Sequence, residues 1–470
     1  MRLPLLIFLI TFQVFAEPIT NFEDAQENLF LRGINFPEND LGQNHPFLTP
    51  TFHYLLDKKT RSRMSAGNEL ILLPDGKSYQ KKLQMVKSAK SSILLSVMSF
   101  ECGETGKEMT DALIEAKKRG VDVRVILDIM YSRIIPIFKK CYKKLKKNGV
   151  KITSSPHSIR LRSVGKMMHD KILVKDLKEA VIGGQNMMDI NNLSIETNFN
   201  YRDTDVWVKG PIILDLALRN LEHWKSFDRS RKKDLLIEKY ISQIREKETE
   251  YKKQGLMGEK NYSKWLASAK GVCRLVGQEP ISKTYYLTTL YTLLAKYSRY
   301  NMVIETPQLM KVDFELAKKM EKEIKDAADR GVRVDFITNG DDFVDSYKVL
   351  MEYTRKTIFP GGGLKKLMSK LAPKLGKNTG IKFLKDAVDW VGDSPVNIWK
   401  YHKFIHSKMS SFDGIINIVG SYNFDRYSST HNFETVIICI DDNFKKQVDR
   451  QLTFDLANSA LHDQVLYNSF

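Results

Sequence analysis

Apolar runs that suit buried strands alternate with amphipathic stretches along this chain, and the same alternation occurs twice. Around residue 91 the sequence reads SAKSSILLSVMSFE and continues into a helical pattern that ends ALIEAKKRGVDVRVILDI. Around residue 294 it reads LLAKYSRYNMVIETP, and a second helical pattern ends EIKDAADRGVRVDFITNG. Each half therefore predicts a helix, a buried strand, a helix, an Arg-Gly-Val turn and another buried strand.

The glycine after each arginine, Gly120 and Gly331, suits the C-terminal cap of a helix. Strands that are separated by helices of this length pair in parallel, with the helices packed on the faces of the sheet. The pattern predicts an α/β protein made of two repeats.

A second repeated block follows in each half. KMMHDKILVKD precedes AVIGGQN, and KFIHSKMSSFD precedes IINIVGSYN. Asn186 follows His169 by 17 residues, and Asn423 follows His406 by 17 residues. Equal spacings in both halves favour a duplicated unit over coincidence.

The second half is longer before its motif and contains a lysine-rich insert at 361–391. Leu364, Leu367, Met368 and Leu371 recur there at helical spacing. Helices of this kind bind anionic membrane surfaces. The alternative, two ordinary surface helices that pack their apolar stripes on the domain, stays open.

The remaining segments complete the predicted organisation. Residues 212–255 predict one long helix that begins after Gly210-Pro211 and ends at Gly255. We expect the following division: signal peptide 1–16, unassigned extension 17–75, first repeat 76–245, connecting segment 246–272 and second repeat 273–470.

The N-terminus has the features of a secretory signal. One positive charge at Arg2 precedes the apolar run from Leu3 to Phe15, and small residues lead to Ala16. The run is shorter than the roughly 20 residues that span a bilayer as a helix. We expect cleavage after Ala16 and export, to the periplasm, the outer membrane or the medium; an uncleaved anchor is the alternative.

Composition agrees with a folded protein that meets anions. The chain has 470 residues, 42% of them hydrophobic, which is enough for two domains or two large repeats. Its 74 Lys and Arg exceed its 56 Asp and Glu, giving a net charge of +18. Such a charge favours nucleic acid or anionic phospholipid as a partner, although a merely solvated basic surface has the same composition.

Four cysteines are too few to form the scaffold of a chain of this size, and none stands at metal-ligand spacing. Cys439 lies in an apolar run, which predicts a core residue. A disulfide between Cys102 and Cys141 is possible in an exported protein, and the sequence leaves it undecided.

Histidine and lysine stand two residues apart in each motif, His169 with Lys171 and His406 with Lys408. In a strand, residues i and i+2 point to the same face, so each pair projects an imidazole beside an ammonium. Such a pair suits an anion. One histidine can attack phosphorus while the other donates a proton to the leaving oxygen.

Asn186 and Asn423 each end a second predicted strand at a glycine-containing turn, which lets backbone approach a ligand closely. Lysine, asparagine and backbone N–H groups together suit a phosphoryl group, because negative charge builds on its non-bridging oxygens in the transition state.

With both motifs in view, the chain resembles the phospholipase D superfamily with two His-x-Lys-(x)4-Asp motifs, and among its branches it is most similar to cardiolipin synthase-like proteins. The resemblance covers roughly residues 78–225 and 275–442 and includes HDKILVKD, GGQN, YRDTDVWVKGP, RGVRV, HSKMSSFD and GSYNFDRYSSTHNFE. It implies a pseudo-twofold α/β sandwich with one active site at the interface of the repeats.

The resemblance also implies roles for residues. His169 would be the nucleophile and His406 the acid, with no metal or cofactor. The phosphate would be held by Lys171, Lys408, Asn186 and Asn423.

Acidic residues would support this site. Glu434 and Asp203 would orient the histidines, with Asp205 as a less favoured alternative to Asp203. The motif aspartates, Asp176 and Asp413, would brace the site without touching substrate. One departure concerns the arginine that the family places four residues after the second asparagine, where this chain has Tyr427 and carries Arg426 one position earlier.

The expected activity is metal-independent hydrolysis or transfer of a phosphatidyl group, through a covalent phosphohistidine, with water or an alcohol as acceptor. The expected partners are an anionic phospholipid membrane surface and a phosphatidyl substrate. An exported nuclease is the alternative, since the same site would cleave nucleic-acid phosphodiesters. Headgroup, acceptor and oligomeric state stay open.

Overall fold

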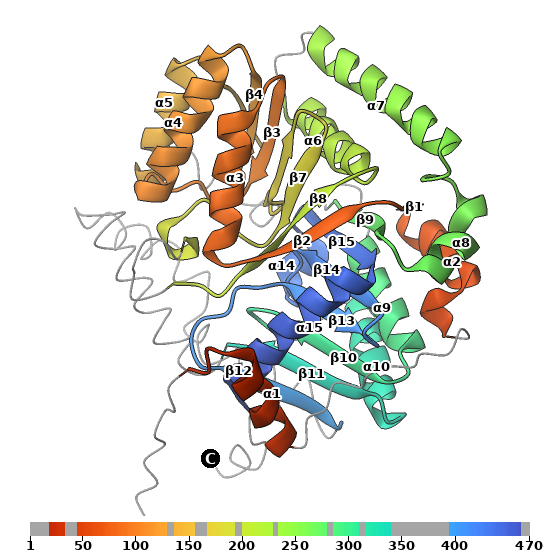
Figure 1. The fold of residues 1–470 in the computed structure, drawn as a ribbon. Helices are drawn as coiled ribbons and strands as arrows, with labels where there is room; N and C mark the ends of the chain where they lie inside the picture. The colour runs from red at the N-terminus through yellow and green to blue at the C-terminus, as the bar shows by residue number, and fades with distance from the viewer. Residues whose placement is uncertain are drawn as a thin grey trace, which may run out of the picture.

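Two β-sheets, each flanked by helices, make up the fold (Figure 1). This computed structural model describes residues 18–32, 45–128, 136–155, 167–192, 200–228, 234–279, 285–309, 315–339 and 394–461. The predicted signal peptide and the lysine-rich insert lie outside these ranges.

The first sheet contains seven strands among the described residues. In spatial order they are β2 (Glu69–Pro74), β8 (Thr204–Lys209), β7 (Glu179–Gly183), β6 (Ile172–Lys175), β3 (Ser92–Val97), β4 (Asp122–Leu127) and β5 (Lys151–Ser154). The parallel pairing that the helix and strand alternation predicts holds for β3, β4 and β5, whereas the other pairs are antiparallel.

The second sheet repeats this order and adds a short strand at each edge. The described strands are β1 (Met64–Ser65), β9 (Val272–Gln278), β15 (Glu434–Ile440), β14 (Ile416–Gly420), β13 (Met409–Phe412), β10 (Asn301–Glu305), β11 (Arg333–Thr338), β12 (Val396–Tyr401) and β16 (Ser459–Leu461). Here β10, β11 and β12 are parallel. The prediction of two α/β repeats is confirmed.

Helices cover the outer faces of both sheets and also lie between them. The first sheet is covered by α3 (Gly76–Ser88), α4 (Glu104–Lys118) and α5 (Pro136–Lys147), and the second by α2 (Pro50–Thr60), α8 (Tyr262–Ser268), α9 (Tyr286–Tyr297) and α10 (Glu315–Asp329). The central core joins side chains of both sheets to α1 (Phe22–Leu31), α6 (Ile213–Phe227), α7 (Leu235–Lys253) and α15 (Asp442–Ala457).

Alternate residues of one strand serve different cores, which explains the continuous apolar runs. In β3, Ile93 and Leu95 face the outer helices while Leu94 faces the central core. Strands buried on both faces read as unbroken hydrophobic segments. Gly120 and Gly331 both adopt φ +90°, as the predicted helix caps require.

The single long helix predicted over 212–255 is wrong, because the structure forms two helices there. α6 ends at Phe227, where Asp228 is extended, and α7 begins after Asp234, whose side chain accepts a hydrogen bond from the Leu236 amide. α6 packs into the central core between the sheets. Ile237, Tyr240 and Ile244 of α7 also enter that core, so the two helices contribute to it separately.

The extension left unassigned by the sequence contributes to both sheets. β2 pairs with β8 in the first sheet, and β1 pairs with β9 in the second. α1 lies along α15 (Figure 1). These elements are too short and too dependent on distant partners to be read from local periodicity.

All four cysteines form disulfides. Cys102 bonds to Cys141, and Cys273 bonds to Cys439 across the paired strands β9 and β15. Cys439 is buried as predicted, but its partner lies 166 residues away and could not be predicted from local sequence.

Candidate active site

Backbone contacts between the repeats place both His-x-Lys motifs. Met168 forms a β-bridge with Phe433, and the His169 amide donates to the Phe433 carbonyl at 3.1 Å. In the other half Ile405 bridges Arg202, and the His406 amide donates to the Arg202 carbonyl at 2.7 Å. Each histidine therefore lies beside the chain segment of the opposite repeat that carries an acidic residue.

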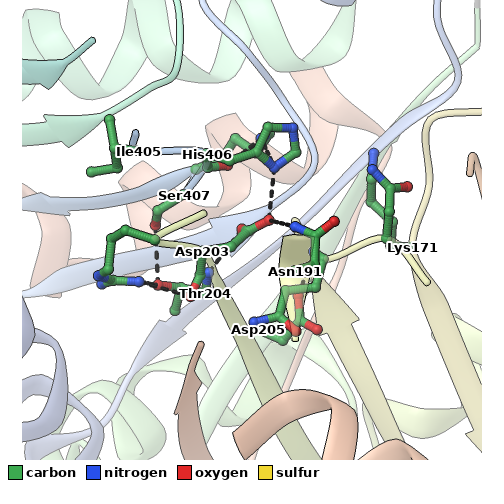
Figure 2. A network of polar contacts seen from close by, with 12 residues as sticks. Lys171, Asn191, Asp203, Thr204, Asp205, Ile405, His406 and Ser407 are labelled. Atoms are coloured by element: carbon green, nitrogen blue, oxygen red, sulfur yellow. Dashed lines mark hydrogen bonds and ion pairs between the residues drawn. The ribbon is translucent and has the colours of Figure 1, made fainter. Parts of the chain in front are cut away.

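Each catalytic-type histidine is bound by the carboxylate of the other repeat. Nδ1 of His169 lies 2.9 Å from Oε2 of Glu434, and Nδ1 of His406 lies 2.7 Å from Oδ2 of Asp203. The second pair is drawn in Figure 2, where the Asp203 carboxylate reaches up to the His406 ring. This geometry leaves Nε2 of each ring available for chemistry.

The Glu434 carboxylate is held by several further donors. Ser421 donates a hydroxyl hydrogen bond to Oε2, Ser428 donates to Oε1 at 2.7 Å, and Asn432 donates to Oε1 at 3.1 Å. Burial opposes its ionisation, but the charge and hydrogen bond of His169, then Lys171 and Ser421, hold the pKa of Glu434 below its ordinary value. Glu434 is therefore an ionised partner for His169.

The Asp203 carboxylate has a different environment. Its oxygens accept from the Thr204 amide at 2.8 Å and from the Asn191 side chain at 3.3 Å (Figure 2). Burial raises the pKa of Asp203, although Lys408 opposes the rise. The two histidines thus have unequal carboxylate partners.

Both motif lysines are buried and lie close to these pairs. Lys171 Nζ donates to the His169 carbonyl at 2.7 Å, and Lys408 Nζ donates to the carbonyl of His406. Burial lowers the pKa of Lys171 to about 7 and that of Lys408 to about 8, despite the opposing charges of nearby carboxylates. Two buried ammonium groups need additional negative charge, which a phosphate supplies.

His406 experiences these lysines directly. Burial first, and then the charges of Lys408, Lys171 and His169, hold the pKa of His406 well below its usual value. The Tyr201 ring stacks on the His406 imidazole with centroids 5.4 Å apart. An anion bound between the lysines would offset their positive charges and so raise the pKa of His406.

The two asparagines follow the second strand of each hairpin. Asn186 accepts a hydrogen bond from the Ser99 amide at 3.2 Å, which fixes the side chain. Asn423 is buried, and its Oδ1 has no hydrogen-bond partner among the described residues. This unsatisfied atom is an acceptor, so a hydroxyl group would satisfy it whereas a phosphate oxygen would not.

The motif aspartates lie at hairpin turns and bind backbone amides. Asp176 accepts from the amides of Lys90, Ser91 and Ser92, and Asp413 accepts from those of Arg299, Tyr300 and Asn301. Each carboxylate thus fixes the loop that enters the first parallel strand of its repeat.

Asp205 also lies away from the His406 ring. Its carboxylate pairs with Lys82 at 2.6 Å, accepts from the Gln185 amide at 3.0 Å and binds the Ser78 hydroxyl. Of the two acidic residues considered in the first repeat, Asp203 is therefore the one that contacts His406.

The sequence did not reveal the residues that bind the two carboxylates, namely Ser421, Ser428, Asn432 and Asn191, or Tyr201, which stacks on His406. The serine in GSYN stands where the first repeat has glycine, which was the available signal for Ser421. Tyr427 is exposed at 43% on α14 (Arg426–Thr430), so the departure there does not disturb the Glu434 contacts.

A family model described as "Cardiolipin synthase, PLD-like domain" matches residues 83–216 and 294–455. The chain belongs to the phospholipase D superfamily, in its cardiolipin synthase-like branch. This match includes both His-x-Lys motifs and both acidic residues that bind the histidines. The prediction of an enzyme of the phospholipase D type, a phosphodiesterase or phosphatidyltransferase, is confirmed at this level.

Curated relatives agree with the family. The chain is 24% identical over 419 residues to "Cardiolipin synthase 1" of Staphylococcus epidermidis, covering 88% of this chain and 73% of that protein. It is 26% identical over 402 residues to "Cardiolipin synthase" of Clostridium perfringens, covering 84% and 72%.

Among solved structures, phosphatidylserine synthase of Haemophilus influenzae Rd KW20 shares the fold with a TM-score of 0.57. The sequences are 13% identical, and the match covers 87% of this chain and 91% of that one. This likeness supports the two-repeat architecture of the present chain.

Among the helices that the structure describes in this chain, none is long and apolar enough to cross a membrane.

Proposed function

We propose that the protein transfers a phosphatidyl group from a phospholipid to an alcohol or to water through a covalent phosphohistidine. The observation that carries this proposal is the pair of histidines, each bound at Nδ1 by a carboxylate of the opposite repeat, with Lys171 and Lys408 beside them. Such a set supplies a nucleophile, a proton donor and positive charge for one phosphodiester.

In the first step, Nε2 of His169 attacks phosphorus and the bond from phosphorus to the headgroup oxygen breaks. His406 donates its Nε2 proton to that oxygen, so the headgroup leaves as an alcohol. Glu434 supports the nucleophile because an ionised carboxylate at Nδ1 keeps the proton there and leaves the Nε2 lone pair free.

In the second step, His406 removes a proton from the acceptor hydroxyl. The acceptor oxygen then attacks the phosphohistidine, and the phosphorus–nitrogen bond breaks, which restores His169. With phosphatidylglycerol as both donor and acceptor, the products are cardiolipin and glycerol. With water, the product is phosphatidic acid.

Roles are assigned to the two histidines by their unequal partners. Glu434 has a lowered pKa and three further donors, which favours a fixed, ionised partner for the attacking His169. His406 lies beside two lysines and a carboxyl whose pKa is raised, so a bound phosphate would favour its protonation.

Positive charge for the phosphate comes from side chains in this proposal. Lys171 and Lys408 would bind the non-bridging oxygens, and the amides of Asn186 and Asn423 would complete the contacts. We therefore propose a reaction that requires no metal.

Phospholipid is the preferred substrate class because the named relatives are cardiolipin synthases. We also propose export to an oxidising compartment, supported by the signal-like N-terminus and by two disulfides that use every cysteine of the chain. The active site would then act at an anionic membrane surface outside the cytoplasm.

The test incubates the purified protein, with and without EDTA, with phosphatidylglycerol liposomes, phosphatidylcholine liposomes and single-stranded DNA. Cardiolipin or phosphatidic acid formed equally in EDTA is the expected result. DNA fragments without lipid products would replace the proposal with a nuclease, and loss of activity in EDTA would overturn metal independence.

A further inference from the structure

The residue between histidine and lysine in each motif is buried and contacts the opposite repeat. Asp170 and Ser407 are both 0% exposed. Neither has a role in the proposed chemistry. Both contact the threonine that follows the histidine-binding carboxylate.

In the first motif, Asp170 is bound from two sides. Thr435 Oγ1 donates to its Oδ1 at 2.7 Å, and Arg219 Nε donates to its Oδ2 at 2.9 Å. Thr435 immediately follows Glu434 on β15. Asp170, the residue after His169, therefore binds strand β15. The same strand carries Glu434, whose carboxylate binds His169.

Arg219 strengthens the same attachment. Its Nη2 donates to the main-chain carbonyls of Glu434 at 3.0 Å and Gln278 at 3.2 Å. A Cβ at Gly277 would lie 2.1 Å from Nη1, so the guanidinium fits only because this residue is glycine. We name Asp170, Arg219 and Thr435 the Asp170 cluster.

The second motif has a similar arrangement, but its own residue is a serine and the aspartate that pairs with the arginine lies elsewhere. The hydroxyls of Ser407 and Thr204 lie 3.1 Å apart (Figure 2), and Thr204 follows Asp203. Arg202 Nη1 donates to Thr204 Oγ1 at 2.6 Å and to the Asp203 carbonyl at 2.7 Å. Arg202 is paired in turn with Asp455 of α15 at 2.6 Å. We name Ser407, Thr204, Arg202 and Asp455 the Arg202 cluster.

Both clusters fix the main chain at the residue whose carboxylate binds a histidine, but they use different side chains. In each, an arginine binds the carbonyl of the carboxylate residue and the threonine hydroxyl is fixed next to it. The balancing aspartate lies on the motif in the Asp170 cluster and on a helix in the Arg202 cluster. Both clusters cross the interface between the repeats.

Buried ion pairs contribute little net stability, because desolvation offsets their attraction. Here the ion pairs are better explained by the need to hold each histidine at a fixed distance from its carboxylate. Each histidine and its carboxylate belong to different repeats, so their separation depends on how the repeats are held together. A misplacement of about 1 Å in such a pair can cost a rate factor on the order of 100.

We propose that Asp170 and Ser407 are positioning residues, each of which fixes the carboxylate of the opposite repeat against the histidine of its own motif. The inference rests on the proposed phosphohistidine chemistry. The Asp170 cluster serves His169 and the first step. The Arg202 cluster serves His406, and therefore the second step and any first step whose leaving group needs a proton.

The experiment uses bis(4-nitrophenyl) phosphate, whose leaving phenolate departs without a proton. With enzyme in excess, release of 4-nitrophenolate reports the attack by His169, and release of 4-nitrophenyl phosphate reports the second step. The variants are Thr435→Val and Thr204→Val, which remove the hydroxyls, and Thr435→Ser and Thr204→Ser, which keep them.

Thr435→Val is expected to slow nitrophenolate release by about 10- to 100-fold, and Thr204→Val is expected to leave it near wild type while slowing the second step by a similar factor. Each serine variant should recover most of the lost rate. Asp170→Asn should behave like Thr435→Val. The control Thr292→Val removes a buried hydroxyl that donates to the Thr288 carbonyl within α9, and its two rates should match wild type.

The inference is overturned if both valine variants match Thr292→Val, or if they slow both steps equally in proportion to a fall in melting temperature. A wild-type protein that cleaves neither this diester nor a phospholipid would instead overturn the proposed function, and the inference with it. Wild-type activity with indifferent variants overturns the inference alone.

Discussion

Nδ1 of His169 lies 2.9 Å from Oε2 of Glu434, although 265 residues separate the two. Asp203 and His406 form the reciprocal pair across the same interface. One active site is therefore completed only when both repeats are folded and docked. Each repeat supplies one histidine of the site and the carboxylate that binds the histidine of the other repeat.

Replacement of either histidine by alanine should remove turnover, since the two act in one reaction. We expect losses of about 10²- to 10⁴-fold or more for His406→Ala, because a general acid and base is lost. A radiolabelled phosphodiester should still label His406→Ala covalently if its leaving group needs no proton. His169→Ala should give no label. Label on His169→Ala would reverse the assigned roles.

Glu434→Gln should impair the reaction through His169 and not through His406. An amide at this position no longer fixes the imidazole tautomer, and comparable changes cost about 10⁴-fold in kcat in a serine protease triad. Single-turnover nitrophenolate release measures this step. Asp203→Asn should spare that release and slow the second step. Glu69→Gln, at an exposed residue of β2, is the control for a carboxylate-to-amide change.

Substrate affinity should weaken as the pH rises above neutrality. The pKa of Lys171 is about 7 and that of Lys408 about 8, so the free enzyme loses both charges as the pH rises through these two values. Phosphate binding favours the protonated lysines and raises their pKa. Affinity is therefore complete only well below the pKa of Lys171 and is lost as the pH rises through both values. KM measured from pH 6 to 9 should increase, and a constant KM would contradict this account.

Asp176→Ala should lower stability while leaving the chemistry intact. The carboxylate accepts hydrogen bonds from three successive amides, of which only that of Ser92 belongs to a buried residue, and a buried donor left unsatisfied costs about 1–3 kcal/mol. Thermal unfolding should show a lower midpoint. Below that midpoint kcat should stay near wild type. A large loss of kcat in the folded variant would show that Asp176 acts on the site itself.

Removal of either disulfide should destabilise the protein by about 2–4 kcal/mol. Cys273 and Cys439 lie in the central core, so their replacement by serine would also bury hydroxyls there. Paired alanine variants separate these effects. Melting without reductant measures the loss for each variant, and reduced wild type should melt below either paired variant measured without reductant, because it then lacks both bonds.

The sequence alone determined the duplicated unit and its reactive side chains. Equal spacing from each histidine to its asparagine, and the two Arg-Gly-Val turns, are local features that periodicity and backbone geometry reveal. The same applies to β3 and β4, whose apolar runs are long enough to be read directly. Charge and motif chemistry then led to a phosphodiester.

Only the tertiary structure decided which carboxylate meets which histidine. The resemblance to the phospholipase D superfamily implied Asp203 in the first half and Glu434 in the second, without pairing them to particular rings. The exchange arises because Met168 and Ile405 bridge to the opposite repeat, a contact that no local pattern encodes. The Cys273–Cys439 bond and the Asp170 cluster have the same origin, since long-range partners are fixed by how two sheets pack and not by neighbours in the chain.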